Sequence, residues 1–114
     1  MYPKEEIDGF EQYWRRRKPG RSTAIHYRSD VNIFFQWVQK SPNAVTVHDI
    51  DRFIDWQREL GRAVSTIHRR LIAIRMFYDY LAYIQERDVD NPGVPRRHYP
   101  ASERRLPRDL PDDV

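Results

Sequence analysis

Apolar residues recur at helical spacing along most of the first 86 residues, and residues 65–81 show this pattern most clearly. Their apolar positions follow one another at steps of one to four residues: Ile67, Leu71, Ile74, Phe77, Tyr78 and Leu81. Such spacing stacks the side chains on one face of an α-helix. The other face is basic, with no acid before Asp79. A helix from Ser65 to about Glu86 is therefore predicted to pack on a bundle and to offer cations to a polyanion.

Two earlier segments show the same period. Residues 3–18 carry an apolar stripe, acids near the start and arginines near the end, and Pro19 with Gly20 closes the segment. These signals predict a first helix. A second helix is expected to begin at Ser22 or Thr23 and to run to about Lys40. Its strong core stripe consists of Tyr27, Val31, Phe34 and Val38.

A third helix is expected from Thr46 to Leu60. Thr46 followed by Asp49 resembles a capping box in which Asp replaces the usual Glu. Gly61 is suited to the position after a helix end. Because the exposed face of this helix is acidic and phosphate would repel it, we expect it to face away from any nucleic acid.

The region after Asp88 has a different character. Five of the eight prolines fall in residues 92–111, the apolar period is lost and arginine dominates. This composition predicts an extended, poorly packed basic tail or interdomain linker. We therefore expect a helical domain over residues 1–87 and a basic linker over residues 88–114.

Length and composition exclude several classes of protein. A chain of 114 residues has the size of one domain. It contains no Cys, so disulfides, thiolate nucleophiles and Cys-ligated metals are excluded. No apolar run approaches the ~20 residues needed to cross a bilayer. We therefore expect a cytosolic protein with no membrane partner.

The charge is distributed unevenly, although the formal net charge is only +3. Residues 12–28 and 60–78 contain several cations and no acid. Residues 43–59 carry a net charge of −2, from four acids against two arginines: Asp49, Asp51, Asp55 and Glu59 against Arg52 and Arg58. The two basic segments are therefore candidates for one binding surface.

Other functional sites find no support in the sequence. The four His residues are spread one to an element, without the spacing of metal ligands. The glycines form no phosphate-cradling loop. No set of nucleophile, base and orienting group can be assembled. We therefore expect no metal, no cofactor, no small-molecule ligand and no catalysis by this chain alone.

The four helical signals, in their order and spacing, resemble the N-terminal core-binding domain of the tyrosine recombinases, the phage-integrase family. The matching residues form four groups: Ser22-Thr23, Tyr27, Asp30, Phe34 and Trp37; Thr46-Val47, Asp49-Ile50 and Phe53-Ile54; Ser65-Thr66-Ile67, Arg69-Arg70-Leu71, Ala73-Ile74-Arg75 and Phe77-Tyr78; and Asn91-Pro92 with Arg105-Leu106-Pro107. The resemblance covers about residues 5–110. It implies an all-α fold: a compact, SAM-like four-helix bundle of two crossed helical hairpins, followed by an extended Pro/Arg-rich tail.

In that family the domain forms half of a C-shaped clamp, and its second and fourth helices cross the major groove of the recombination site. The resemblance places these residues against DNA: Thr23, His26, Arg28, Ser29, Ser65, Thr66, Arg69, Arg70 and Ala73. By its chemistry Arg69 is the best candidate for reading a base edge, and Arg70 and Arg75 suit phosphates. The backbone N–H groups near Ser65 and Thr66 could also hold a phosphate.

Catalysis in that family requires an Arg, a His-x-x-Arg pair and a nucleophilic Tyr in a second domain. No His here is followed by Arg three residues later, and the sequence stops about where that domain would begin. We expect a DNA-binding fragment of a recombinase, or a natural truncation that binds without cutting. Its expected partners are double-stranded DNA and, on DNA, other protomers. The isolated domain is expected to be monomeric, in a prokaryotic cytoplasm at the nucleoid.

Two alternatives stay open from the residues alone. An unrelated helical DNA-binding regulator would form a stable dimer on a palindromic site, although no heptad is present. A helical protein-interaction module would use its basic faces only as solvated surface. The apolar anchors of such a module would be Ile25, Ile33, Ile72 and Met76.

Overall fold

A computed structural model describes residues 2–100 of the chain, and every regular element in that range is helical. The elements in chain order are α1 (Lys4–Arg17), α2 (Thr23–Val38), the 3-10 turn η1 (Pro42–Ala44), α3 (Val47–Glu59), α4 (Val64–Asp79), the π-helical turn η2 (Tyr80–Ile84) and α5 (Pro95–His98). The predicted all-α fold with four long helices is confirmed.

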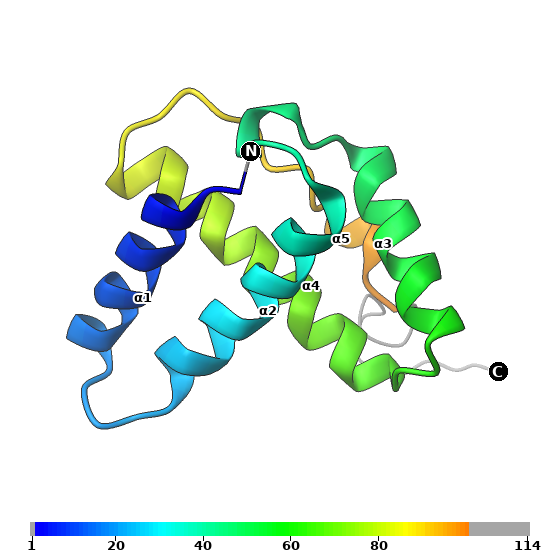
Figure 1. The fold of residues 1–114 in the computed structure, drawn as a ribbon, viewed down its shortest axis with the longest axis horizontal. Coiled ribbons are helices and arrows are strands. Elements are labelled where there is room, and N and C mark those ends of the chain that lie inside the picture. The colour runs from blue at the N-terminus through cyan, green and yellow to red at the C-terminus, as the bar shows by residue number, and fades with distance from the viewer. Residues whose placement is uncertain (1, 101–114) are drawn as a thin grey trace, which may run out of the picture.

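The four long helices form two hairpins that cross (Figure 1). α1 and α2 run in opposite directions and are joined by a short turn, and α3 and α4 form the second, more open hairpin. α2 lies in the middle, where it packs against α1 and α4 and also touches α3. The two hairpins are thus held together mainly where α2 and α4 cross.

A chain of aromatic rings fills the core and links all four helices. Phe10 of α1 lies edge-to-face on Phe77 of α4, with 5.4 Å between ring centroids, and Phe77 contacts Phe35 of α2 at 5.3 Å. On the other side of α2, Phe34 meets Phe53 of α3 at 5.1 Å. All five rings have no exposed surface. Such pairs add about 0.5–1.5 kcal/mol each beyond the burial of their area, so the predicted apolar stripes meet in one core.

The predicted capping box at the start of α3 is present. The backbone N–H of Asp49 donates to the Thr46 hydroxyl at 3.2 Å, and the backbone N–H of Thr46 donates to the Asp49 carboxylate at 2.9 Å. α2 begins at Thr23 after Ser22, as expected, but the Ser22 side chain forms no capping hydrogen bond. α4 begins one residue earlier than predicted, at Val64.

The fourth helix is not α-helical up to Glu86, as the sequence suggested. It changes at Tyr80 into the π-helical turn η2. A π turn rotates successive side chains less than an α turn does, and here both Tyr80 and Leu81 are buried. The Tyr80 hydroxyl lies where a Cβ atom of residue 9 would be, at 2.5 Å from that position. Gly9 in the middle of α1 therefore makes room for this ring.

Residues 88–100 differ from the predicted tail in their packing. The path is irregular up to Val94, as expected, but Pro92, Gly93 and His98 are buried, so the expectation of poor packing is wrong here. Polar anchors hold the segment: the Asn91 amide donates to the Arg75 carbonyl at 3.1 Å, and the Arg75 guanidinium donates to the Gly93 carbonyl. Polar anchors of this kind produce no apolar periodicity, so the sequence pattern did not predict the packing of this segment. The rest of the predicted tail, residues 101–114, lies outside the described residues.

The capping box yields a prediction about stability. Replacing Thr46 with Ala removes the hydroxyl that accepts from the Asp49 N–H, so the free energy of unfolding should fall by about 1 kcal/mol. Ser22→Ala is the matched control, because the Ser22 side chain does not cap α2. Urea denaturation followed by circular dichroism measures both. Equal losses in the two variants would contradict this account of the capping.

Candidate nucleic-acid interface

Two of the four long helices begin on the same side of the bundle. In Figure 1, α2 and α4 both start at the lower side, where α1 and α3 end. The turns over residues 18–22 and 60–63 lie there too. α1 and α3 begin on the opposite, upper side. The helix directions therefore bring the start of α2, the start of α4 and the end of α1 onto one side.

The first turns of the four long helices differ in charge between the two sides. The first turns of α1 and α3 carry acids, whereas those of α2 and α4 carry none. An α-helix has a partial positive charge at its N-terminus, which an acid in the first turn would offset. The last turn of α1 adds Arg15, Arg16 and Arg17. We call the first two turns of α2 and α4, with the last turn of α1, the basic side.

The predicted residues of α2 divide into two kinds. His26 and Ser29 are exposed and Thr23 is half-buried. Arg28 instead reaches back to α1, where its Nη1 donates to the carboxylates of Asp8 at 2.6 Å and Glu11 at 3.1 Å. The hydrogen bond to Asp8 raises the pKa of Arg28. Arg28 therefore joins the two helices of the first hairpin.

The start of α4 offers backbone donors beside hydroxyl groups. Ser65 is exposed and Thr66 is half-buried. The Ile67 N–H donates to the Ala63 carbonyl at 3.1 Å, as the first hydrogen bond of the helix. The N–H groups of residues 64–66 precede that bond and point out of the helix end, the arrangement that binds phosphates at helix N-termini.

Arg69 lies where α4 crosses α2. Its Nε and Nη2 donate to the two carboxylate oxygens of Asp30 at 3.0 and 2.9 Å. Asp30 is 1% exposed, whereas half of the Arg69 side chain is exposed. The hydrogen bond to Asp30 raises the pKa of Arg69. This guanidinium is thus fixed on its inner edge and open on its outer one.

Three other predicted contact residues are engaged inside the fold. The Arg70 side chain is only 13% exposed, donates to the Gln57 Oε1 of α3, and lies 3.5 Å from Asp30. Arg75 is bonded to the Gly93 carbonyl. Ala73 has no exposed surface, so direct contact through it is excluded in this conformation. Alanine is small enough to occupy either face of a helix, so the sequence alone did not reveal its burial.

Comparison with known proteins identifies the family of this chain. Residues 7–84, from α1 to the end of η2, match the family described as phage integrase, N-terminal SAM-like domain. The chain belongs to this family. It is also 32% identical over 117 aligned residues to a protein named tyrosine recombinase XerC from Pelotomaculum thermopropionicum. That match covers 94% of this chain but 38% of the recombinase. No solved structure matches the chain.

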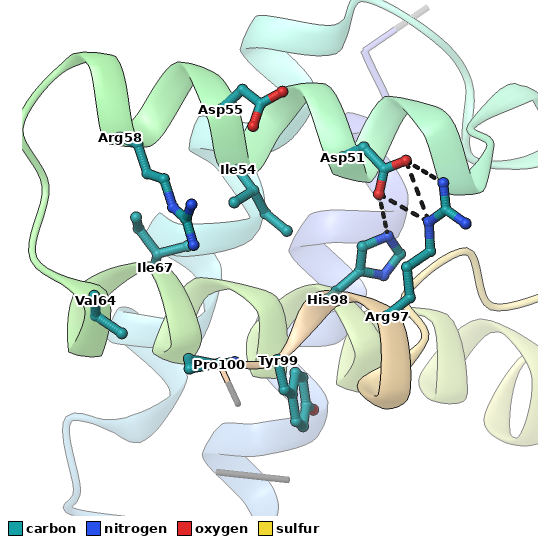
Figure 2. Close-up of a pocket in the computed structure, with 10 residues that line it drawn as sticks. All are labelled: Asp51, Ile54, Asp55, Arg58, Val64, Ile67, Arg97, His98, Tyr99 and Pro100. Atoms are coloured by element: carbon teal, nitrogen blue, oxygen red, sulfur yellow. Dashed lines mark hydrogen bonds and ion pairs between the residues drawn. The ribbon is translucent and has the colours of Figure 1, made fainter. Parts of the chain in front are cut away.

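The domain has a second polar cluster, which the sequence did not reveal (Figure 2). It joins α3 to α5: Asp51 accepts from the Arg97 Nε at 2.9 Å and lies 3.0 Å from the His98 Nε2. The Val94 N–H donates to the His98 Nδ1 at 2.9 Å, so the neutral ring donates from Nε2 to Asp51. Arg97 holds the pKa of Asp51 down at about 2, and burial lowers the pKa of His98. We assign this cluster to docking of residues 94–100, since Asp51 is separated from its partners by 46 and 47 positions.

Among residues 2–100, no three His, Asp or Glu side chains come together as they would around a metal ion. None of the helices in this range is long and apolar enough to span a membrane.

The His98 environment predicts a dependence of stability on pH. Because burial holds the pKa of His98 below its usual 6.5, the unfolded chain binds a proton first as the pH falls. The contribution of His98 to the free energy of unfolding should therefore be constant above about pH 7 and decrease from about pH 6.5 down to the lowered pKa. Denaturation at half-unit pH intervals measures this decrease.

Two variants test the assignment to His98. His98→Gln should remove this part of the pH dependence, whereas His26→Gln, at an exposed position of α2, should retain it. A decrease of the same size in His98→Gln as in the original chain would show that another group is responsible.

Proposed function

We propose that this domain binds duplex DNA with its basic side and places α2 and α4 across the major groove, as half of a recombinase clamp. The observation that carries the proposal is that both acid-free helix starts lie on one side, together with the arginine-rich end of α1. Phosphates are attracted to such a surface by the helix ends and by the arginines alike. An α-helix also fits the width of the major groove.

The proposed contacts follow from exposure and from what each side chain already binds. We propose direct contact for Thr23, His26, Ser29, Ser65, Thr66 and Arg69. Ser65 and the backbone N–H groups beside it suit a phosphate, and the outer edge of Arg69 suits a guanine. Arg28, Arg70 and Arg75 would act through the helices that they hold in place, and Ala73 through close packing.

The end of the described chain supports this orientation. Pro100 lines a hollow of about 410 Å³ together with Val64, Ser65, His68, Arg69 and Ile72. Residues 94–100 therefore lead to the start of α4 on the basic side. A catalytic domain connected through residues 88–114 would approach the DNA from there and complete the clamp. We propose that the DNA-binding domain ends after residue 87. Residues 88–100 would then be the packed part of the linker to the catalytic domain.

For the whole protein we propose site-specific breaking and rejoining of DNA, with the catalytic residues in a second domain. The proposal draws on the relative named tyrosine recombinase, of which this chain spans 38%. The partners of the whole protein would be double-stranded DNA at a recombination site and further protomers on that DNA. Its place would be the prokaryotic cytoplasm, at the nucleoid.

The alternative of a protein-interaction module is supported by some exposed apolar side chains. Ile25 is 53% exposed and lies on α2, and Tyr83 and Ile84 of η2 are 77% and 49% exposed. The other three anchors expected for such a module are half-buried: Ile33, Ile72 and Met76. This alternative predicts binding to protein or to an acidic peptide, and none to duplex DNA.

DNA binding should be sensitive to salt. If about five phosphates are neutralised, a plot of log K against log salt should have a slope of about −4.5. Arg69→Ala should weaken binding about tenfold and make the slope less steep by about 1 if Arg69 also lies near a phosphate. Fluorescence anisotropy of residues 1–114 with a labelled duplex, at four salt concentrations, measures both quantities.

Lys4→Ala is the matched control. It removes the same charge from the start of α1 on the opposite side, where the Lys4 side chain is 71% exposed. This variant should bind as the original chain does. Equal weakening by the two substitutions would show that binding responds only to net charge. An absence of binding even at low salt would contradict DNA recognition by this domain.

A further inference from the structure

We infer that Asp30 is a specificity-determining positioning residue: its buried carboxylate holds the Arg69 guanidinium so that the outer edge of that group reads a guanine. The inference rests on the proposed DNA-binding function. Asp30 itself would not touch DNA, because only 1% of it is exposed. It would act through Arg69, whose side chain is half exposed.

The hydrogen bonds between the two residues leave the required donors free. A guanidinium has five N–H groups. Asp30 accepts from the Nε and Nη2 atoms of Arg69. Because a planar guanidinium presents its donors in a fixed fork, a carboxylate on the Nε side leaves the edge between Nη1 and Nη2 pointing away from it. That edge carries two parallel donors, which match the O6 and N7 acceptors of guanine in the major groove.

Asp30 is itself held firmly at the crossing of α2 and α4. The Arg70 Nε lies 3.5 Å from the same carboxylate, and Arg70 is anchored on α3 by Gln57. Three helices therefore restrain one carboxylate. Arg69 and Arg70 carry two positive charges against the one negative charge of Asp30, so the crossing still presents a net positive charge to DNA. A restrained Arg69 loses less conformational freedom on binding a base than a free side chain would.

The affinities of Asp30→Asn for specific and for unrelated duplexes distinguish a positioning role of Asp30 from a purely structural one. Asp30→Asn keeps the shape of the side chain and removes one negative charge near the DNA. Affinity for unrelated duplexes should stay the same or increase, because repulsion of phosphate decreases. Preference for the selected site should decrease, because Arg69 is no longer held in one orientation. General destabilisation would lower both affinities together.

Asp49 provides a matched control within the chain. It is 2% exposed and forms ion pairs with two cations, Lys40 and Arg52, much as Asp30 pairs with two arginines. It lies at the start of α3, on the side opposite the basic side. Asp49→Asn should therefore lower stability as any disrupted buried ion pair does. It should leave the ratio of specific to non-specific affinity unchanged.

The experiment uses the 114-residue chain. A preferred duplex is first selected from a random pool with the original chain. Affinities for that duplex and for a scrambled one are then measured at a single salt concentration. Asp30→Asn should reduce the ratio of the two affinities about tenfold and lose the preference at one guanine position. In an Arg69→Ala background, Asp30→Asn should change the ratio no further, since the two residues act as one unit.

A measurement on the unaltered chain covers the case in which Asp30→Asn does not fold. In nuclear magnetic resonance spectra the Arg69 Nε–H should give a protected signal in the free protein, and this signal should persist when the selected duplex binds. Its loss on binding would mean that Arg69 leaves Asp30 to reach DNA, which would overturn the inference. An unchanged affinity ratio in folded Asp30→Asn would also overturn it. If the original chain binds no duplex, the proposed function itself fails.

Discussion

α2 is packed on two sides by aromatic rings, and the positions of the other helices depend on that packing. Phe35 meets Phe77 of α4, while its neighbour Phe34 meets Phe53 of α3. Two adjacent residues on one helix thus hold two different helices. Since interiors are packed as densely as organic crystals, these contacts allow little change in the crossing of α2 and α4. The crossing in turn brings the two acid-free helix starts to one side.

The arginines of this chain serve several purposes that their sequence positions do not distinguish. Arg28 and Arg70 tie helices together through carboxylate and amide oxygens. Arg75 and Arg97 hold residues 91–100 against the bundle. Arg69 combines a buried partner with an exposed edge. The basic segments therefore contain side chains that fix the helices as well as those that we propose to contact DNA.

The apolar period was a reliable guide to the fold, and less so to individual contacts. The stripes of the four helices and the Thr46 capping box follow from local spacing, and the structure confirms them. Ala73 was expected on the DNA-facing side but is buried, because alanine carries too little apolar surface to mark a face. After Asp79 the chain forms a π turn, in which Tyr80 packs over Gly9 of another helix. No local pattern could predict it.

By itself, the sequence determined which segments form the four long helices, where each of them begins, and which of those first turns lack acids, because these properties depend on residues within a few positions of one another. Only the tertiary structure decided which cations stay available. The Arg69–Asp30 pair joins residues 39 positions apart, and the Arg97–Asp51 pair joins residues 46 positions apart. Hydrogen bonds of this kind require the helices to be packed first, so their partners are set by the fold and leave no periodic trace in the chain.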